Sequence, residues 1–227
     1  MKIAIQLYSL FVKIPKPVWR SSAYNFRYTA KYSNKMADIT ALLLIFDGSE
    51  EMEAVITADV LRRGGVCVTI ASLGDNECVK CSREVKICAD TTLANVSEKE
   101  KYDVVILPGG LGAARAFAES AEVGKLLKKQ EKGNRLIAAI CAAPIALKSH
   151  GIGKGKRLTS YPAMKNQLTN GYEYSEDRVV VDGNLITSRG PGTAFAFGLA
   201  LIERLVSKET AVTVAKGMLY EDYKYKL

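Results

Sequence analysis

Short apolar runs alternate with amphipathic segments along the chain and predict its fold. The apolar runs of strand length are 39–46, 66–71, 103–107 and 137–140. Runs that are largely apolar, without strict alternation, are typical of parallel strands that helices cover on both faces. Residues 50–63 instead repeat their apolar positions at helical spacing and stop at a Gly-Gly pair, which predicts a helix. A strand, a helix and a second strand in succession indicate an α/β protein with a parallel sheet.

The rest of the chain extends the same architecture. Helices are predicted at 112–119, 121–132, from 144 to about 149, 162–170, 193–206 and 208–216, and hairpins within 78–90 and 179–187. Because no internal repeat or change of composition interrupts residues 36–227, we expect one α/β domain with a flavodoxin-like, mostly parallel sheet. Function is expected at the carboxyl ends of the strands, where Gly48, Gly109, Gly110 and Cys141 lie.

Residues 136–147 form the segment around which the rest is arranged. The predicted strand stops at Cys141, and Pro144 stands in the first turn of the helix that follows. Backbone N–H groups and the positive end of the helix dipole then point at the side chain, which predicts a lowered thiol pKa. This arrangement is a nucleophile elbow with sulfur in place of the serine oxygen. From this segment alone, the alternative is that Cys141 is a small buried hydrophobe.

Charge is distributed unevenly along the chain. The 227 residues carry a net charge of +8, but residues 1–35 hold seven Lys and Arg residues and no Asp or Glu. The remainder carries 25 basic and 24 acidic residues, a net charge of +1. A nucleic-acid interpretation based on overall charge is therefore excluded, because the excess lies in one N-terminal segment.

The N-terminal segment has a pattern of its own. Lys, Gln and Ser recur at helical spacing among apolar residues as far as Ile14, and Pro15 and Pro17 follow, which predicts an amphipathic helix with a cationic stripe. The composition of 1–35 is typical of a mitochondrial transit peptide. The alternatives are a secretory signal and a leader that is unprocessed or untranslated, with Met36 as an internal start. We expect a mitochondrial or cytoplasmic location, with the nucleus as a further possibility, and no membrane span, because no run of eighteen apolar residues occurs.

Five cysteines cannot all pair within the chain, and their spacing is not that of a disulfide framework, which indicates a reducing compartment. Cys78 and Cys81 have the spacing of a redox or metal pair, but no second pair and only one histidine accompany them. We expect surface thiols in a hairpin there, rather than a zinc site or a thioredoxin-like pair. Cys67 is expected in the core or half-buried, and Cys88 is expected to be exposed or at an interface.

Acid–base candidates are few. His150, the only histidine, lies nine residues after Cys141, about 12 Å away at the helical rise. Without a Cys-His pair, cysteine-protease chemistry lacks its general base. The remaining candidates are Glu50, Glu51 and Glu53 at the start of the first helix. One that faces inward would have a raised pKa and could donate a hydrogen bond to the thiolate as a neutral acid. The alternative is that all three are surface groups that compensate the helix dipole.

Gly109 and Gly110 follow a predicted strand. The segment from Gly110 begins like a dinucleotide fingerprint, but Arg115 takes the place of its third glycine, and no acidic residue ends a strand about twenty positions later. We therefore expect no nucleotide, metal or other cofactor. Glycines permit close backbone approach, and the N–H groups of Gly110 and Ala142 could form an oxyanion hole.

Four motifs occur in order along the chain: Gly48-Ser-Glu-Glu-Met-Glu53, Leu107-Pro-Gly-Gly110, Ala138-Ala-Ile-Cys-Ala-Ala-Pro144 and Thr187-Ser-Arg-Gly-Pro-Gly-Thr193. Together they resemble the ThiJ/PfpI superfamily, and more closely its eukaryotic, Parkinson-disease-associated deglycase branch. The resemblance covers about residues 39–220. It implies a flavodoxin-like fold, homodimers, an elbow cysteine that oxidises readily to a sulfinate, and protection against oxidative stress.

Residue by residue, the resemblance places the reactive cysteine on Cys141 and its partner acid on Glu53. Gly110 and Ala142 match the backbone groups around the sulfur, and Gly109 lies beside them at the position for the oxyanion or substrate. The superfamily's proteases carry histidine directly after the cysteine. Ala142 holds that place here, which argues further against peptidase activity.

The resemblance also assigns residues away from the elbow. Cys81 and Cys88 match two secondary redox cysteines of the family. Tyr161 stands before a proline where the family has histidine, and we place it at the substrate position. A phenol with a pKa of about 10 donates a hydrogen bond but is a poor base at neutral pH. We therefore expect slower hydrolysis than in the family and largely unchanged sulfur oxidation.

The activity implied is that of a glutathione-independent glyoxalase and protein deglycase on methylglyoxal-type aldehydes and their adducts. The alternative is a redox sensor or chaperone whose Cys141 becomes a sulfinate, with little turnover. Expected partners are small aldehydes or glycated proteins and a second copy of the chain, with no specific nucleic-acid site.

Overall fold

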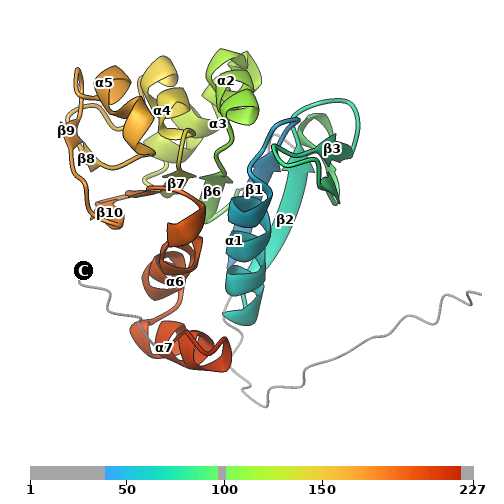
Figure 1. The fold of residues 1–227 in the computed structure, drawn as a ribbon, viewed down its shortest axis with the longest axis vertical. Coiled ribbons are helices and arrows are strands. Elements are labelled where there is room, and N and C mark those ends of the chain that lie inside the picture. Colours follow the sequence, from blue (N-terminus) through green and yellow to red (C-terminus); the bar gives the residue numbers. More distant parts are fainter. Residues whose placement is uncertain (1–38, 97–100, 221–227) are drawn as a thin grey trace, which may run out of the picture. The chain divides into compact units, whose positions relative to one another are not determined.

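The computed structural model describes residues 39–96 and 101–220 (Figure 1). The expected transit peptide or leader at 1–35 lies outside the described residues. A sheet of seven strands forms the centre, made of β1 (Thr40–Ile45), β2 (Cys67–Ser72), β5 (Thr91–Thr92), β6 (Val104–Leu107), β7 (Leu136–Ile140), β10 (Val179–Asp182) and β11 (Leu185–Ser188). Their order is β10-β11-β7-β6-β1-β2-β5, and only the β10–β11 pair is antiparallel. The predicted flavodoxin-like, mostly parallel sheet is confirmed.

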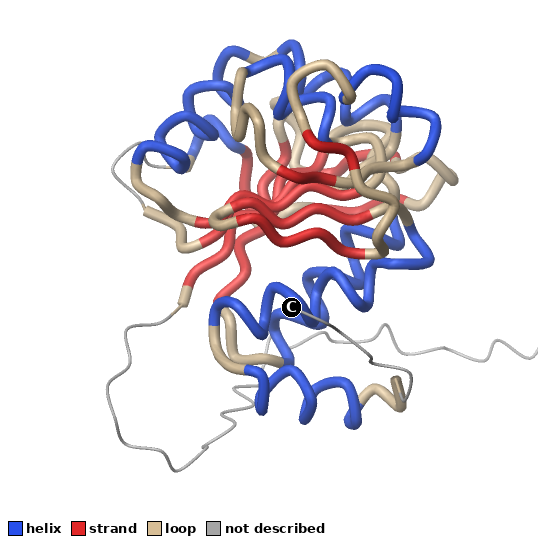
Figure 2. The backbone as a smooth tube through the Cα atoms, turned by 90° about the vertical axis from the view of Figure 1, so that its left-hand side faces the viewer, coloured by secondary structure: helices blue, strands red, loops and turns tan. Residues whose placement is uncertain are grey.

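Helices cover both faces of this sheet (Figure 2). One face carries α1 (Glu51–Arg63), α6 (Ala194–Leu205) and α7 (Lys208–Gly217), and the other carries α2 (Leu111–Glu119), α3 (Ala121–Lys132), α4 (Pro144–His150) and α5 (Lys165–Leu168). In β1, Leu43 packs into the first core, and Leu42 and Leu44 pack into the second. Both faces are therefore dry, which explains why the strands read as apolar runs.

Several short elements complete the fold. They are β3 (Cys78–Lys80), β4 (Lys86–Cys88), β8 (Arg157–Leu158), β9 (Glu173–Tyr174) and three 3-10 turns at Leu93–Asn95, Pro162–Met164 and Pro191–Thr193. The first two strands form the predicted antiparallel hairpin. The helix predicted over 162–170 is divided into a 3-10 turn and α5. The two-residue strands β5 and β9 were not predicted, because so short a segment carries no periodic pattern.

Helix α1 begins and ends with defined caps. The side chain of Glu50 accepts a hydrogen bond from the backbone N–H of Glu53 and caps the amino end. Gly64 ends the helix as predicted. In the part of the chain described here, no helix is both long and apolar enough to cross a membrane.

Four of the five cysteines differ from expectation. Cys78 and Cys88 stand opposite each other in the hairpin and form a disulfide. Cys81 is a buried free thiol, so the prediction of surface thiols at Cys78 and Cys81 is wrong. Cys67 is exposed rather than buried, since it is the first residue of its strand. The register that joins Cys78 to Cys88 could not be read from spacing alone.

Candidate functional site

Strand β7 turns sharply at Cys141, as the elbow prediction requires. Cys141 has a φ of +62°, a left-handed conformation that costs a non-glycine residue roughly 1–3 kcal/mol. The turn is held from both sides: the Cys141 N–H donates to the Ser188 carbonyl at 3.0 Å, and the Cys141 carbonyl accepts from the Tyr161 N–H at 2.8 Å. The side chain is 8% exposed and faces the core that α1 covers.

Glu53 is the glutamate of the first helix that faces inward, as predicted. It is fully buried, and its Oε2 accepts a hydrogen bond of 2.7 Å from the Gly109 N–H. Its Oε1 is buried, and no backbone group donates a hydrogen bond to it. Burial raises the pKa of Glu53 to about 8, although the Gly109 N–H and a hydrogen bond with Cys141 oppose the shift. The carboxyl group is therefore mostly protonated at neutral pH.

Gly109 and Gly110 bring the backbone after β6 against both side chains. A Cβ on Gly109 would lie 2.5 Å from the Cys141 Cβ and 2.7 Å from the Glu53 Oε2. Gly110 has a φ of +85°, and a Cβ there would lie 2.0 Å from the Gly48 carbonyl oxygen. No side chain fits at either position, so the two glycines are what allow Cys141 and Glu53 to meet.

The pKa of the Cys141 thiol shifts against the prediction. The N–H groups of Gly110 and Ala142 do lower the pKa, as expected for donors that favour a thiolate. Burial is the larger effect, and with the charge that Glu53 carries when ionised it raises the pKa to about 12. The sequence revealed the donors but not the depth of burial. Because Glu53 holds its proton at neutral pH, its charge opposes the thiolate only at higher pH.

Glu50, an acid–base candidate from the sequence, instead supports the site as the cap of α1. Its Oε2 accepts from the Glu53 N–H at 2.8 Å, and its own N–H donates to the Gly109 carbonyl at 2.9 Å. One residue therefore fixes both the helix that carries Glu53 and the loop that binds the Glu53 carboxyl. The spacing of three residues between Glu50 and Glu53 is the available sequence signal for such a cap.

The motif that begins at Thr187 supports the elbow from β11. The Ser188 hydroxyl bonds the Thr193 hydroxyl at 2.7 Å and the Arg178 carbonyl at 2.7 Å. The Thr193 Oγ1 also accepts from the Gly190 N–H at 3.0 Å. These bonds hold the strand end whose carbonyl accepts from the Cys141 N–H. The sequence marked this motif without indicating that role.

Tyr161 lies beside the elbow, in the segment that follows β8. Its backbone N–H bonds the Cys141 carbonyl, and its side chain is 48% exposed. A Cβ on Gly190 would lie 3.6 Å from the tyrosine ring. The backbone of Tyr161 thus belongs to the site, and the half-exposed ring lies near the Gly190 turn.

Other candidate residues lie elsewhere. Cys81 and Cys88 belong to the hairpin segment. His150 bonds the Phe117 carbonyl at 2.8 Å, so it serves structure at the far end of α4, as its spacing predicted. Within 39–96 and 101–220, no group of three or more His, Cys, Asp and Glu side chains is placed to hold a metal ion.

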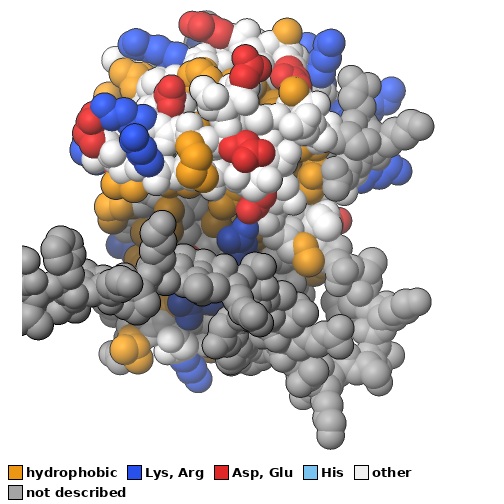
Figure 3. Space-filling view, turned by 90° about the vertical axis from the view of Figure 1, so that its right-hand side faces the viewer, with side chains coloured by type: hydrophobic (Ala, Val, Ile, Leu, Met, Phe, Trp, Pro, Cys, Tyr) orange, Lys and Arg blue, Asp and Glu red, His pale blue; other side chains and the backbone are white. Residues whose placement is uncertain are grey.

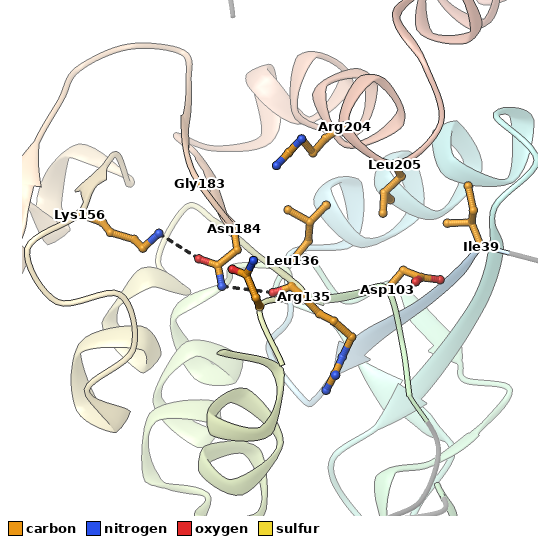
Figure 4. A pocket seen from close by; sticks show the side chains of 10 residues that line it. Ile39, Asp103, Arg135, Leu136, Lys156, Gly183, Asn184, Arg204 and Leu205 are labelled. Atoms are coloured by element: carbon orange, nitrogen blue, oxygen red, sulfur yellow. Dashed lines mark hydrogen bonds between the residues drawn. The ribbon is translucent and has the colours of Figure 1, made fainter. Parts of the chain in front are cut away.

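A separate hollow of about 410 Å³ opens at the amino ends of the strands, opposite to the elbow (Figure 4). Arg135, Lys156 and Arg204 contribute positive charge to its lining. Lys156 donates to the Asn184 Oδ1 at 2.9 Å, and the Asn184 amide reaches the Arg135 carbonyl at 3.4 Å. Lys156 also bonds the Asp182 carbonyl, so part of this charge already serves the fold.

Known proteins resemble this chain in sequence and in fold. The sequence profile of the DJ-1/PfpI family matches residues 39–204. Protein dj-1beta of Drosophila melanogaster is 58% identical over 181 residues, which cover 79% of this chain and 96% of that protein. A Caenorhabditis elegans protein named glutathione-independent glyoxalase DJR-1.2 is 42% identical over 178 residues, covering 78% of this chain and 94% of that one. The crystal structure of Drosophila melanogaster DJ-1beta is similar with a TM-score of 0.78 and 57% identity, covering 80% of this chain and 98% of that chain.

Proposed function

The chain belongs to the DJ-1/PfpI family, and on this premise we propose that it is a glutathione-independent glyoxalase of the DJ-1 type that protects against oxidative stress. Its proposed substrates are methylglyoxal-type aldehydes, and early aldehyde adducts of proteins when it acts as a deglycase. The observation that carries the proposal is the buried carboxyl of Glu53, mostly protonated at neutral pH, beside the sulfur of Cys141. A family member named as a glyoxalase supports the same activity.

In the first step, the sulfur of Cys141 attacks the aldehyde carbon. A carbon–sulfur bond forms, the carbonyl electron pair moves to oxygen, and the thiol proton passes to the minor fraction of Glu53 that is ionised near neutral pH. The N–H groups of Gly110 and Ala142, which already lower the thiol pKa, are the proposed donors to the developing oxyanion. Protonation of that oxygen by Glu53 gives the hemithioacetal.

In the second step, Glu53 removes the proton from the former aldehyde carbon and returns it to the neighbouring carbon. The hydroxyl proton of the hemithioacetal passes to the former ketone oxygen, so the former ketone is reduced to an alcohol and the hemithioacetal carbon is oxidised to a thioester. Water then hydrolyses the thioester, which releases a hydroxy acid and the free thiol. A carboxyl with a pKa of about 8 suits both donation and acceptance near neutral pH. No external oxidant or reductant is consumed.

The test is hydroxy-acid formation from methylglyoxal without glutathione. We expect turnover by the purified protein, its loss in Cys141→Ser, and its retention in Cys67→Ser, which removes an exposed free cysteine instead. Equal turnover by parent and Cys141→Ser would contradict the assignment of the nucleophile. Absence of turnover in the parent would contradict the glyoxalase proposal itself.

A redox sensor is the second candidate, and a specific observation favours it. The Glu53 carboxyl is hydrogen-bonded with the Cys141 side chain and is mostly protonated at neutral pH. A protonated carboxyl could donate to a sulfinate on Cys141 and stabilise it. Two molecules of hydrogen peroxide would each transfer one oxygen atom to the sulfur and leave as water.

Glu53→Gln separates the two candidates. The amide keeps a hydrogen-bond donor for the sulfinate but cannot move a proton. We expect the variant to lose hydroxy-acid formation and still gain two oxygen atoms on Cys141 under graded peroxide, as measured by mass spectrometry. Unchanged turnover in this variant would contradict the proton-transfer role.

We also propose that residues 1–35 direct the protein to mitochondria, with the mature domain in mitochondria or cytoplasm. Their basic, acid-free composition supports the proposal. Fusion of 1–35 to a fluorescent reporter should give mitochondrial import, and replacement of Lys2, Lys13 and Lys16 by glutamate should abolish it. Cytoplasmic or secreted reporter from the unaltered fusion would contradict it.

A further inference from the structure

The β3–β4 hairpin holds a disulfide outside the Cys141 site. Cys78 and Cys88 are paired across the two strands, and both are exposed. Cys78 also lines a surface hollow together with Asp75 and Glu77. The bond is therefore accessible to a thiol from solution, and the two carboxylates beside it disfavour anionic thiols.

Cys81, the free cysteine that directly follows β3, is a poor nucleophile toward this disulfide. Burial raises the pKa of Cys81 to about 11, with further contributions from Glu51, Glu50 and Asp47. A thiol of this kind attacks disulfides slowly at neutral pH.

The hairpin is bonded to the loop that precedes α1. The Gly48 N–H donates to the Lys80 carbonyl at 2.8 Å, and the Lys80 N–H donates to the Asp47 Oδ1 at 2.8 Å. Both bonds are made by the backbone of Lys80, the last residue of β3, and Cys78 is the first residue of that strand. The loop is therefore held by a strand that the disulfide fastens to β4.

The turn of the hairpin is hydrogen-bonded to the start of α1. The Glu51 carboxylate accepts from the Ser82 hydroxyl at 3.0 Å and from the Arg83 N–H at 2.8 Å. The Ser82 N–H donates to the Ser49 carbonyl at 2.8 Å. Glu51 is next to the cap residue Glu50 and two residues before Glu53. The hydrogen bonds from the hairpin turn therefore hold the helical turn that positions the Glu53 carboxyl.

We propose that Cys78 and Cys88 form a second redox site, a reversible disulfide that a dithiol reductant opens and whose state controls how firmly the hairpin holds Glu53. The path runs from the pair through β3 to the 47–51 loop. From there, Glu50 and the close contact of Gly110 with the Gly48 carbonyl lead to Cys141. This site is separate from the proposed glyoxalase chemistry and would exist without it.

The reaction is thiol–disulfide exchange. One thiolate of the reductant attacks an exposed sulfur of the pair, which breaks the Cys78–Cys88 bond and gives a mixed disulfide and one cysteine thiolate. The second thiolate of the reductant displaces the other cysteine and closes the reductant's own disulfide. Two electrons pass to the protein, and protons from water complete both thiols.

Opening the pair should loosen the hairpin and the start of α1. We expect faster amide exchange at Gly48, Lys80, Ser82 and Arg83, by at least about threefold, because the constraint on the hairpin is lost. Cys141 should be alkylated by iodoacetamide at least about threefold faster. Burial raises the pKa of this thiol in the closed form, and loosening would expose the thiol to solvent. Any methylglyoxal turnover should fall, because Glu53 is no longer fixed.

The experiment equilibrates the full chain in mixtures of reduced and oxidised dithiothreitol. Differential alkylation with peptide mapping follows the pair, hydrogen exchange follows the hairpin, and iodoacetamide follows Cys141. Cys78→Ser and Cys88→Ser should match the reduced parent in every mixture. Cys67→Ser should behave as the parent does.

Two results would overturn the proposal. One is failure of the Cys78–Cys88 bond to form even with bis(2-hydroxyethyl) disulfide, a neutral oxidant stronger than oxidised dithiothreitol. The other is a pair that opens and closes while hairpin exchange and Cys141 alkylation stay constant. The parent protein can be compared in its reduced and oxidised states without any substitution. The test therefore remains decisive even when a variant fails to fold. A protein without methylglyoxal turnover would fail the glyoxalase proposal, yet the exchange and alkylation measurements would still decide this one.

Discussion

At the scale of single residues, the site depends on a carboxyl group kept neutral by burial. The buried Glu53 carboxyl accepts a single backbone hydrogen bond, from the Gly109 N–H, so ionisation would leave a poorly compensated buried charge. The proton that remains near neutral pH is therefore available to Cys141. Removing the carboxylic acid should change both chemistry and the pH dependence of stability.

The first prediction concerns the pH dependence of folding. Burial raises the pKa of Glu53 to about 8 from 4.5, so the folded state binds this proton more tightly than the unfolded chain. Stability from this group is fully present below pH 4.5 and is lost as the pH rises through 8. We expect Glu53→Gln to lack this loss, so urea unfolding should show the parent losing roughly 3–4 kcal/mol relative to the variant between pH 5 and 8. Parallel pH profiles would contradict the raised pKa.

The second prediction concerns Gly110. Alanine there must adopt a φ of +85° and place its Cβ 2.0 Å from the Gly48 carbonyl oxygen. We expect Gly110→Ala to lower the free energy of unfolding by roughly 3 kcal/mol or more, because strain and a backbone clash add. Gly65 is the control, since it has a φ of +82° and open space around its Cβ position. Gly65→Ala should cost only the conformational part, roughly 1 kcal/mol. Equal losses in chemical denaturation would contradict the close approach.

At the scale of elements, the hairpin and α1 act as one unit joined through Glu51. Although burial opposes the shift, hydrogen bonds from its own N–H, the Ser82 hydroxyl and the Arg83 N–H lower the pKa of Glu51. Stability from this carboxylate is therefore present above its unfolded pKa and is lost as the pH falls. Its pH dependence has the opposite sign to that of Glu53, two residues along the same helix.

The third prediction follows from that contact. We expect Glu51→Gln to lower the free energy of unfolding at pH 7 by about 1–2 kcal/mol, because a charged acceptor of two hydrogen bonds is lost. The difference from the parent should shrink below pH 4. Glu84→Gln, on the exposed turn of the same hairpin, is the control and should change stability little. A constant Glu51→Gln effect at all pH values would show that the charge is not responsible.

The elements themselves were largely predictable from sequence. The runs at β1, β6 and β7 and the helical spacing of α1 are local patterns, so they identified the sheet and the turn at Cys141. The predicted lowering of the Cys141 pKa was wrong, because the thiol is buried by α1 and by the glycine pair after β6. Both are distant from Cys141 in sequence. The Cys78–Cys88 bond was missed for a related reason, since it depends on hairpin register. The role of Glu53 was open from the helix alone and was assigned through the family resemblance.

At the scale of the whole molecule, the described surface mixes charge of both signs with small hydrophobic groups. Figure 3 shows this on the side that carries the β3–β4 hairpin, where hydrophobic side chains lie between acidic and basic ones. The exposed side of α1 is different, because Met52 and Val55 are 51% and 53% exposed and stand three residues apart. Side chains at this spacing share one helix face. We propose that this face meets a second copy of the chain in a homodimer.

The last prediction tests that proposal. Dimers of a symmetric kind bury the same patch on both copies, so one substitution acts twice at the interface. We expect Val55→Lys to shift the protein from dimer to monomer in size-exclusion chromatography with light scattering, because two buried ammonium groups would face each other across an apolar contact. Leu111→Lys is the control, since Leu111 is 46% exposed on α2, across the sheet from α1. A monomeric parent would contradict the homodimer, and a dimer that survives Val55→Lys but not Leu111→Lys would place its interface on the α2 face. Glu53 lies on the inner side of the helix that carries Val55. We therefore expect loss of the dimer to change the rate of Cys141 alkylation as well.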